Sequence, residues 1–392
     1  MVQGGIHVKL IELATMEQRI EQLEKVVAPF AERANKHDED RTFPFENYQD
    51  LKEIGYQVLT IPKKYGGAGI SLYELIRLQE VIAASDGSTA LSIGWHMGIT
   101  KHLGENSIWK EDIYQAFAQD VINNGALLNN AATEPATGSP TRGGKPETVA
   151  KKSGDGWVIN GRKTFTTLAP ILNYFVVSAS IDGTDQVGNF LIKRERNGVS
   201  IDETWDSIGM VATGSHDLVL EDVHADQADL VEYLTPGNKP AAGWLLHIPA
   251  CYLGIARAAQ TYAVAFATSY SPSSIKGTIS DIPAVKQKIG EMELRILESE
   301  SFLYTIAQKW DKSDEETRQN MKPELGAVKL SVVNKALEIV DLAMRIVGAR
   351  SLSKQNPLQR YYRDVRAGLH NPPMDDMTIT QLANTSIGKI GQ

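Results

Sequence analysis

The sequence predicts an α+β protein with three domains, in the order helical, β and helical. Its 392 residues, 42% of them hydrophobic, are more than one compact core normally organises. Apolar residues recur at helical spacing near both ends of the chain, whereas the middle holds short strand-like runs separated by turn residues. We therefore expect a helical domain over residues 1–122, a β-domain over 123–235 and a helical bundle over 236–392.

The expected N-terminal domain starts with a helix over residues 16–36. The apolar side chains that recur in it at close to helical spacing are Ile20, Leu23, Val27 and Phe30. A short helix over 48–54 and a glycine-rich loop at 65–69 follow. Ser71 can cap the next helix, because serine accepts a hydrogen bond from the first helical turn. A further apolar helix is expected over 89–103.

The expected β-domain contains four clear strand patterns, at 156–161, 174–179, 188–192 and 217–223. The first ends in Asn160-Gly161, a pair typical of tight hairpin turns.

The expected C-terminal domain contains two long amphipathic helices. Apolar residues mark one helix between Val285 and Ile306 and the other between Val328 and Ile346. Long helices with short connections form antiparallel bundles, so we expect a four-helix bundle.

Composition restricts the partners and the compartment. The net charge of −8 argues against nucleic acid or an anionic membrane as partner. The single cysteine, Cys251, lies in an apolar run and is expected to be buried, and no Cys/His cluster has the spacing of a metal site. The first 25 residues lack the apolar core of a signal peptide, and no apolar stretch could span a bilayer. We expect a soluble, cytoplasmic protein.

Several segments, in order along the chain, resemble signatures of the acyl-CoA dehydrogenase family. They are 61–69 (IPKKYGGAG), 133–139 (TEPATGS), 160–167 (NGRKTFTT), 205–215 (WDSIGMVATGS) and 357–364 (PLQRYYRD). The resemblance covers nearly the whole chain. It implies the acyl-CoA dehydrogenase fold, with an N-terminal helical domain, a central β-barrel-like domain and a C-terminal four-helix bundle, assembled as a homotetramer.

The resemblance also implies a chemistry. In this family a base removes the α-proton of an acyl-CoA thioester while the β-hydride passes to N5 of FAD. An electron-transfer flavoprotein can then serve as electron acceptor, in fatty acid metabolism. Cofactor contacts are implied for Thr133, Ser139, Phe165 and Thr167, with Arg345 and Gly348 near the cofactor of a neighbouring subunit. Substrate contacts are expected from His96, Ser139 and Ser215.

The chain departs from the family pattern at the catalytic base. The usual glutamate position falls on Pro372, and the alternative position used by a minority of the family falls on Trp244. Neither side chain can take a proton. The family's RxxFG segment, which reaches the adenine end of FAD, is replaced by residues 271–277 (SPSSIKG).

Three nearby residues could replace the missing base, namely His370, Asp375 and Asp376. Asp376 is better explained as a cap for the helix that follows. A second interpretation is a flavin-dependent monooxygenase of the same fold, which uses reduced flavin and oxygen and often has a histidine where His370 stands. A third is a scaffold that has lost its catalytic base.

Overall fold

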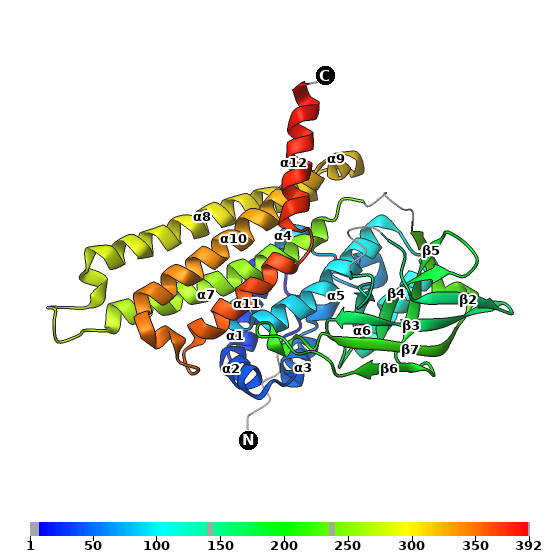
Figure 1. Cartoon of the computed structure of the whole chain (residues 1–392), viewed down its shortest axis with the longest axis horizontal. Coiled ribbons are helices and arrows are strands. Elements are labelled where there is room, and N and C mark those ends of the chain that lie inside the picture. The colour runs from blue at the N-terminus through cyan, green and yellow to red at the C-terminus, as the bar shows by residue number, and fades with distance from the viewer. Residues whose placement is uncertain (1–7, 139–143, 235–239, 391–392) are drawn as a thin grey trace.

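The computed structural model describes residues 8–138, 144–234 and 240–390, and it has the predicted order of helices, sheet and helices (Figure 1). The N-terminal helices are α1 (Met16–Val27), α2 (Phe30–Asp40), α3 (Phe45–Glu53), α4 (Leu72–Ser85), α5 (Gly87–Asn106) and α6 (Glu111–Asn124). The strands are β1 (Leu128–Ala131), β2 (Val149–Ser153), β3 (Gly156–Thr166), β4 (Tyr174–Ile181), β5 (Val187–Lys193), β6 (Val199–Asp202), β7 (His216–Ala225) and β8 (Leu230–Leu234). The C-terminal helices are α7 (His247–Ser269), α8 (Pro283–Lys312), α9 (Glu315–Asn320), α10 (Lys322–Val347), α11 (Pro357–Ala367) and α12 (Asp375–Ile390).

The helix predicted over residues 16–36 is divided into α1 and α2. Pro29 stands at the start of α2, and a proline has no N–H to continue the hydrogen bonding of the preceding turn. The cap predicted at Ser71 is confirmed, since its Oγ accepts a hydrogen bond from the N–H of Glu74 at 3.0 Å.

The central domain is one mixed sheet, in which β1 pairs with β4 beside the path β6-β7-β3-β2-β4-β5-β8. The strands expected at 174–179, 188–192 and 217–223 are confirmed as β4, β5 and β7. The hairpin turn expected at Asn160-Gly161 is wrong, because β3 runs through these residues to Thr166. The pairing of β3 with β7 shifts register here, and the Asn160 side chain accepts a hydrogen bond from the N–H of Asp222 at 2.8 Å.

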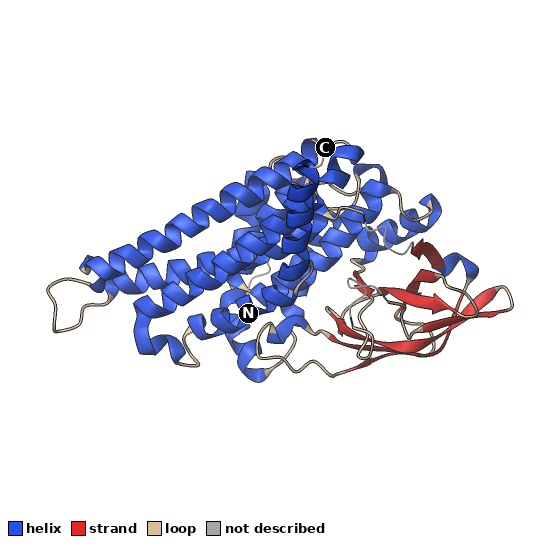
Figure 2. Cartoon of the chain, turned by 45° about the horizontal axis from the view of Figure 1, so that its top comes forward, coloured by secondary structure: helices blue, strands red, loops and turns tan. Residues whose placement is uncertain are grey.

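The C-terminal bundle consists of α7, α8, α10 and α11, with α10 packed against the other three. Helix α7 also packs against α4 and α5, which joins the bundle to the N-terminal domain. Figure 2 shows the sheet at one end of this helical body.

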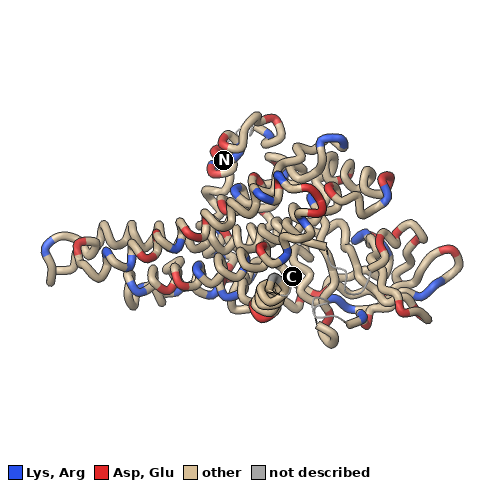
Figure 3. Tube along the Cα trace, turned by 90° about the horizontal axis from the view of Figure 1, so that it is seen from above, with Lys and Arg blue, Asp and Glu red and all other residues tan. Residues whose placement is uncertain are grey.

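Cys251 on α7 is buried as predicted, and its thiol donates to the carbonyl of Gly87 at 3.4 Å. No helix in the described ranges is long and apolar enough to cross a membrane. Acidic and basic residues are interspersed along the helices (Figure 3).

A buried polar cluster joins the three domains. Asp364 of α11 accepts a hydrogen bond from the N–H of Met210, in the β-domain, at 2.6 Å. One turn earlier, Arg360 lies 3.9 Å from the carboxylate of Asp86 at the start of α5. All three charged side chains are almost fully buried. Burial raises the pKa of Asp364 to about 6, although the nearby Arg360 guanidinium and the Met210 N–H oppose this rise.

A buried ion pair anchors the loop that follows β1. Lys163 of β3 donates to Glu134 at 2.6 Å, and both side chains are nearly inaccessible to solvent. Glu134 also accepts hydrogen bonds from Thr137 and from the N–H and hydroxyl of Thr148. Burial alone would raise the pKa of Glu134, but these bonds outweigh it and lower the pKa to about 2. Glu134 is therefore an ionised structural residue.

Removing the Glu134 carboxylate is expected to destabilise the fold. Glu134→Ala should cost about 3–5 kcal/mol in the free energy of unfolding, because Lys163 remains buried without its partner. Urea unfolding at neutral pH measures this. Glu147→Gln, at an exposed position in the same segment, is the control and should change stability by no more than about 0.5 kcal/mol.

The same pair predicts how stability depends on pH. The pKa of Glu134 is about 2 in the folded chain and about 4.3 when unfolded, so its contribution is complete above the higher value. The contribution is lost as the pH falls from the higher value toward the lower one. Wild type should therefore lose stability over this range more steeply than Glu134→Gln; parallel curves would contradict the assignment.

Candidate functional site

Two of the motif segments lie side by side in the β-domain. The carbonyl of Thr133 accepts a hydrogen bond from the N–H of Thr164 at 2.9 Å, next to the Glu134–Lys163 ion pair. Glu134 and Gly138 form a small antiparallel bridge that closes the loop between them. Thr133 is thus held against the end of β3. Ser139, expected at the pyrophosphate, lies outside the described residues.

Phe165 is held in a conformation that is unusual for its residue type. Its φ is 57°, in the left-handed region that bulky residues avoid, and its side chain is 61% exposed. The register of β3 against β7 shifts between Lys163 and Thr166, so Phe165 leaves the regular alternation of the strand. Its ring meets Trp205 edge to face at 6.0 Å. A strained, exposed aromatic is a feature of functional sites.

Three buried hydroxyl groups form a chain next to Phe165. Thr167 Oγ1 lies 2.9 Å from Ser215 Oγ, which in turn lies 2.8 Å from Thr213 Oγ1. The main chain of Thr167 is fixed as well, since its carbonyl accepts from the Asn129 amide at 2.9 Å. The structure therefore brings together Thr167 and Ser215, which are 48 residues apart in the sequence. Thr213 was not predicted as a site residue; it lies inside the 205–215 segment, and that resemblance was the signal available for it.

Arg345 and Gly348 lie on the surface at the end of α10. Arg345 is largely exposed and pairs with Asp341 one turn away, and Gly348 ends the helix with a φ of 70°. Their exposure leaves them free to meet another subunit.

His96 does not have a free ring nitrogen. It is fully buried on α5, where Nδ1 accepts from the N–H of Leu128 at 3.1 Å and Nε2 lies 3.3 Å from the carbonyl of Gln57. Burial lowers the pKa of His96 to about 4, so the ring is neutral. This geometry favours a structural role, linking α5 to β1, over the expected substrate contact.

The loop expected to carry the base is docked on the bundle. Asn371 accepts a hydrogen bond from the hydroxyl of Tyr252 on α7 at 2.6 Å. Asp375 accepts from Lys329 at 3.2 Å and from the Asn334 amide at 3.1 Å, both on α10. Asp375 therefore balances a buried lysine and anchors the start of α12. His370, by contrast, is exposed.

The alternative base position, Trp244, lies in an aromatic cluster between the N-terminal domain and α7. Its ring stacks on His247 at 6.1 Å and meets Trp95 edge to face at 5.8 Å. Gly98 of α5 leaves the space, because a Cβ there would lie 2.6 Å from the Trp244 ring. His247 is fully buried, and its ring nitrogens have no hydrogen-bond partner among the described residues.

The residues at the end of β3 fit a flavin. Its ring system needs an apolar surface beside it and hydrogen-bonding groups at its polar edges. Phe165 presents an exposed aromatic ring. Thr133, half-buried on the segment bonded to the end of β3, and the Thr167 hydroxyl, paired with Ser215, are the polar side chains nearest to it in the chain.

Comparison with known families agrees with the order of the three domains. The sequence profile of the acyl-CoA dehydrogenase N-terminal domain matches residues 13–106, that of the middle domain matches 129–223 and that of the C-terminal domain matches 246–371.

Individual relatives have diverse names. YdbM of Bacillus subtilis, an acyl-CoA dehydrogenase by name, is 52% identical over 93% of this chain and 96% of its own. The 3-(aryl)acrylate reductase of Clostridium sporogenes is 28% identical over 88% of this chain and 92% of its own. The L-evernosamine nitrososynthase of a Micromonospora species is 27% identical over 89% of this chain and 85% of its own.

Solved structures share the fold at lower sequence identity. TdsC of Paenibacillus sp. A11-2, crystallised with FMN and indole, has a TM-score of 0.85 and 21% identity, and covers 95% of this chain and 98% of its own. Butyryl-CoA dehydrogenase of Megasphaera elsdenii has a TM-score of 0.84 and 18% identity, and covers 96% of this chain and 99% of its own. With three domain profiles matched in order and a relative at 52% identity, the chain belongs to the acyl-CoA dehydrogenase family of flavin-dependent oxidoreductases.

Proposed function

We propose that this chain binds FAD and dehydrogenates the α,β-bond of an acyl-CoA thioester. The observation that carries the proposal is Phe165, an exposed aromatic in a strained backbone conformation, next to the buried Thr167–Ser215 hydroxyl pair. When bound, FAD supplies the acceptor for the hydride that leaves the β-carbon.

The cofactor contacts follow from this geometry. Thr133 and Thr167 would hydrogen-bond the polar edges of the flavin, and Ser139 would reach the pyrophosphate. Arg345 and Gly348 would approach the cofactor of a second subunit, which matches their exposure. Ser215 would orient Thr167 or contact the substrate directly.

His370 is the proposed base. It would take the α-proton on a ring nitrogen, a role that needs an accessible side chain. Asp375 is the weaker of the two candidates, because Lys329 and Asn334 already occupy both of its oxygens. The thioester carbonyl must be bound by other groups, and an electron-transfer flavoprotein would reoxidise the enzyme.

A flavin-dependent monooxygenase is the second candidate. The observation that favours it is the absence of a carboxylate at both family positions, Pro372 and Trp244, the second of which is filled by an aromatic cluster. TdsC, a dibenzothiophene monooxygenase, shares the fold. The third interpretation is a scaffold without a catalytic base, in which no acyl-CoA would react with a flavin.

Truncating Phe165 is expected to weaken FAD binding. Loss of an aromatic contact of about 0.5–1.5 kcal/mol should raise the Kd about two- to tenfold. Flavin fluorescence quenching during titration of apoprotein with FAD measures this. Tyr233→Ala removes another exposed aromatic on the same sheet and should bind FAD like wild type. Equal Kd values for both variants would place the flavin elsewhere.

Replacing His370 should separate the two candidate bases. His370→Ala should slow anaerobic flavin reduction by an acyl-CoA about 10²–10⁴-fold, the usual contribution of a general base. Asp375→Asn leaves Lys329 without its carboxylate, so its thermal unfolding temperature is measured first; the folded variant should show flavin reduction at close to the wild-type rate in the same stopped-flow measurement. The reverse result would make Asp375 the base. If no acyl-CoA reduces wild type, oxygen uptake with reduced flavin and an aromatic or amine substrate tests the monooxygenase.

The C-terminal helix should take part in assembly. Figure 1 shows α12 standing out from the end of the bundle, and it exposes Ile379 by 56% and Ile387 by 69%. We expect a homotetramer by sedimentation velocity, reduced to smaller species by Ile379→Asp with Ile387→Asp. Asn384→Asp with Ser386→Asp adds the same two charges at exposed polar positions of α12 and should leave the tetramer intact. A wild-type monomer would contradict this assembly.

A further inference from the structure

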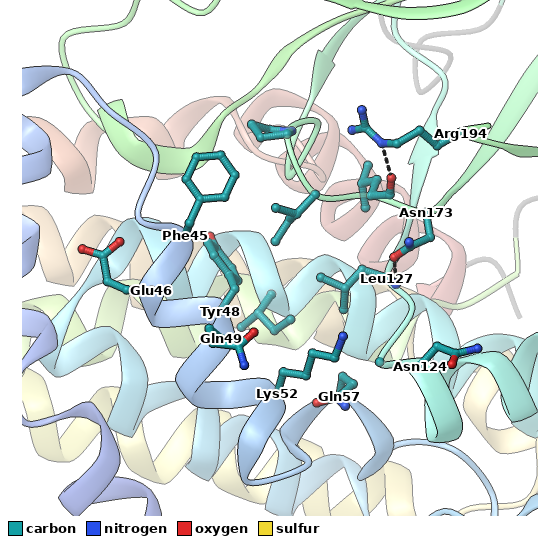
Figure 4. A pocket seen from close by; sticks show the side chains of 15 residues that line it. Phe45, Glu46, Tyr48, Gln49, Lys52, Gln57, Asn124, Leu127, Asn173 and Arg194 are labelled. Atoms are coloured by element: carbon teal, nitrogen blue, oxygen red, sulfur yellow. Dashed lines mark hydrogen bonds between the residues drawn. The ribbon is translucent and has the colours of Figure 1, made fainter. Parts of the chain in front are cut away.

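A cavity lies between the N-terminal domain and the β-domain. It has a volume of about 600 Å³ and is lined on one side by α3 and on the other by the segment 170–173 (Figure 4). This volume is within the range of small-molecule sites, roughly 300–1,000 Å³. None of its lining residues belongs to the proposed flavin or base residues.

The lining is cationic. Lys52 and Arg194 line the cavity, and no carboxylate of the described residues forms an ion pair with either. The acidic lining residue, Glu46, is bonded by His37 at 2.8 Å, and Figure 4 shows it directed away from the other side chains. The Lys52 side chain passes over Gly125, and a Cβ added to Gly125 would lie 2.3 Å from the Cε of Lys52. The Lys52 ammonium points toward Leu127. The absence of a side chain at Gly125 therefore lets the ammonium reach the cavity.

The cavity also contains an unsatisfied polar group. Gln57 is only 6% exposed, and its Oε1 has no hydrogen-bond partner among the described residues. Buried polar atoms are rarely left unpaired, and a side-chain amide can turn to present either its oxygen or its nitrogen. A ligand with a polar group would satisfy it.

The remaining walls are apolar. Ile93, Leu127 and Leu172 are buried, and Ile171, which also lines the cavity, is half-buried. At the mouth, Phe45 leaves 57% of its side chain exposed. An apolar ligand body would cover this surface and the Phe45 ring.

We propose that this cavity is a binding site for a small organic carboxylate with an apolar, planar body, whose carboxylate pairs with Lys52 and whose body packs between Phe45 and Ile171. Arg194 supports the site by fixing the segment, since its guanidinium donates to the carbonyls of Leu172 and Ala169. Because Thr167 lies three residues before Pro170, the first residue of this segment, an occupied cavity would stiffen the chain close to the hydroxyl pair.

Isothermal titration of the full chain with 2-naphthylacetate tests the site. We expect saturable binding at one site per chain, and at least about tenfold weaker binding of the neutral isostere 2-naphthylacetamide, the factor for a charge-assisted hydrogen bond. Lys52→Met keeps the apolar stem and should lose about the same factor for the acid while leaving the amide unchanged. Lys151→Met, at an exposed lysine on β2, should bind like wild type.

A steric variant keeps the test independent of charge. Ile171→Trp should fill the cavity and abolish binding of both compounds, with the thermal unfolding temperature measured to confirm that it folds. Equal affinity for acid and amide, or no effect of Lys52→Met, would overturn the proposal. Binding that Phe165→Ala weakens and Lys52→Met does not would place the ligand at the proposed flavin site and overturn it as well.

Discussion

The carboxylate of Asp364 is the constraint on which the arrangement of the three domains depends. It is buried in the helical bundle and receives the main-chain N–H of Met210 from the β-domain, while Arg360 one turn away faces Asp86 of the N-terminal domain. A buried charge is costly unless it is paired and hydrogen-bonded. Displacing the β-domain would remove a hydrogen bond from Asp364, and displacing the N-terminal domain would separate Arg360 from Asp86. The raised pKa of Asp364, about 6, reflects that cost. The resulting rigidity fixes where the β-domain faces the bundle.

Within the β-domain, the Glu134–Lys163 pair provides the same kind of rigidity at a smaller scale. It holds the loop that carries Thr133 against β3 and so lets the next residues of the strand adopt a strained form. Phe165 keeps its positive φ and its exposed ring only because the structure around it is firmly held by other contacts. The proposed flavin site would therefore be preorganised, with little ordering required when a ligand arrives.

At the two positions where the resemblance places the family's base, Pro372 and Trp244, this chain has no carboxylate. At Trp244 the carboxylate is replaced by a ring packed between Trp95 and His247, with Gly98 providing the space. In the loop after α11, Asp375 is tied to a buried lysine, whereas His370 stays exposed. His370 is therefore the more accessible of the two proposed bases.

The periodicity of hydrophobic residues, which is a local signal, was enough to predict the order of the domains, most helices and three of the principal strands. Short motifs, which are also local, identified the two segments that meet at the proposed cofactor site. It was wrong at Asn160-Gly161, since pairing with β7 overrode the turn preference of the dipeptide. Only the tertiary structure decided that His96 is saturated by main-chain groups and that Asp375 serves Lys329. It also decided that Lys52 meets the segment 170–173 across a cavity. Hydrogen-bond partners that are far apart in the chain meet only when the domains pack together, so a local sequence pattern cannot predict them.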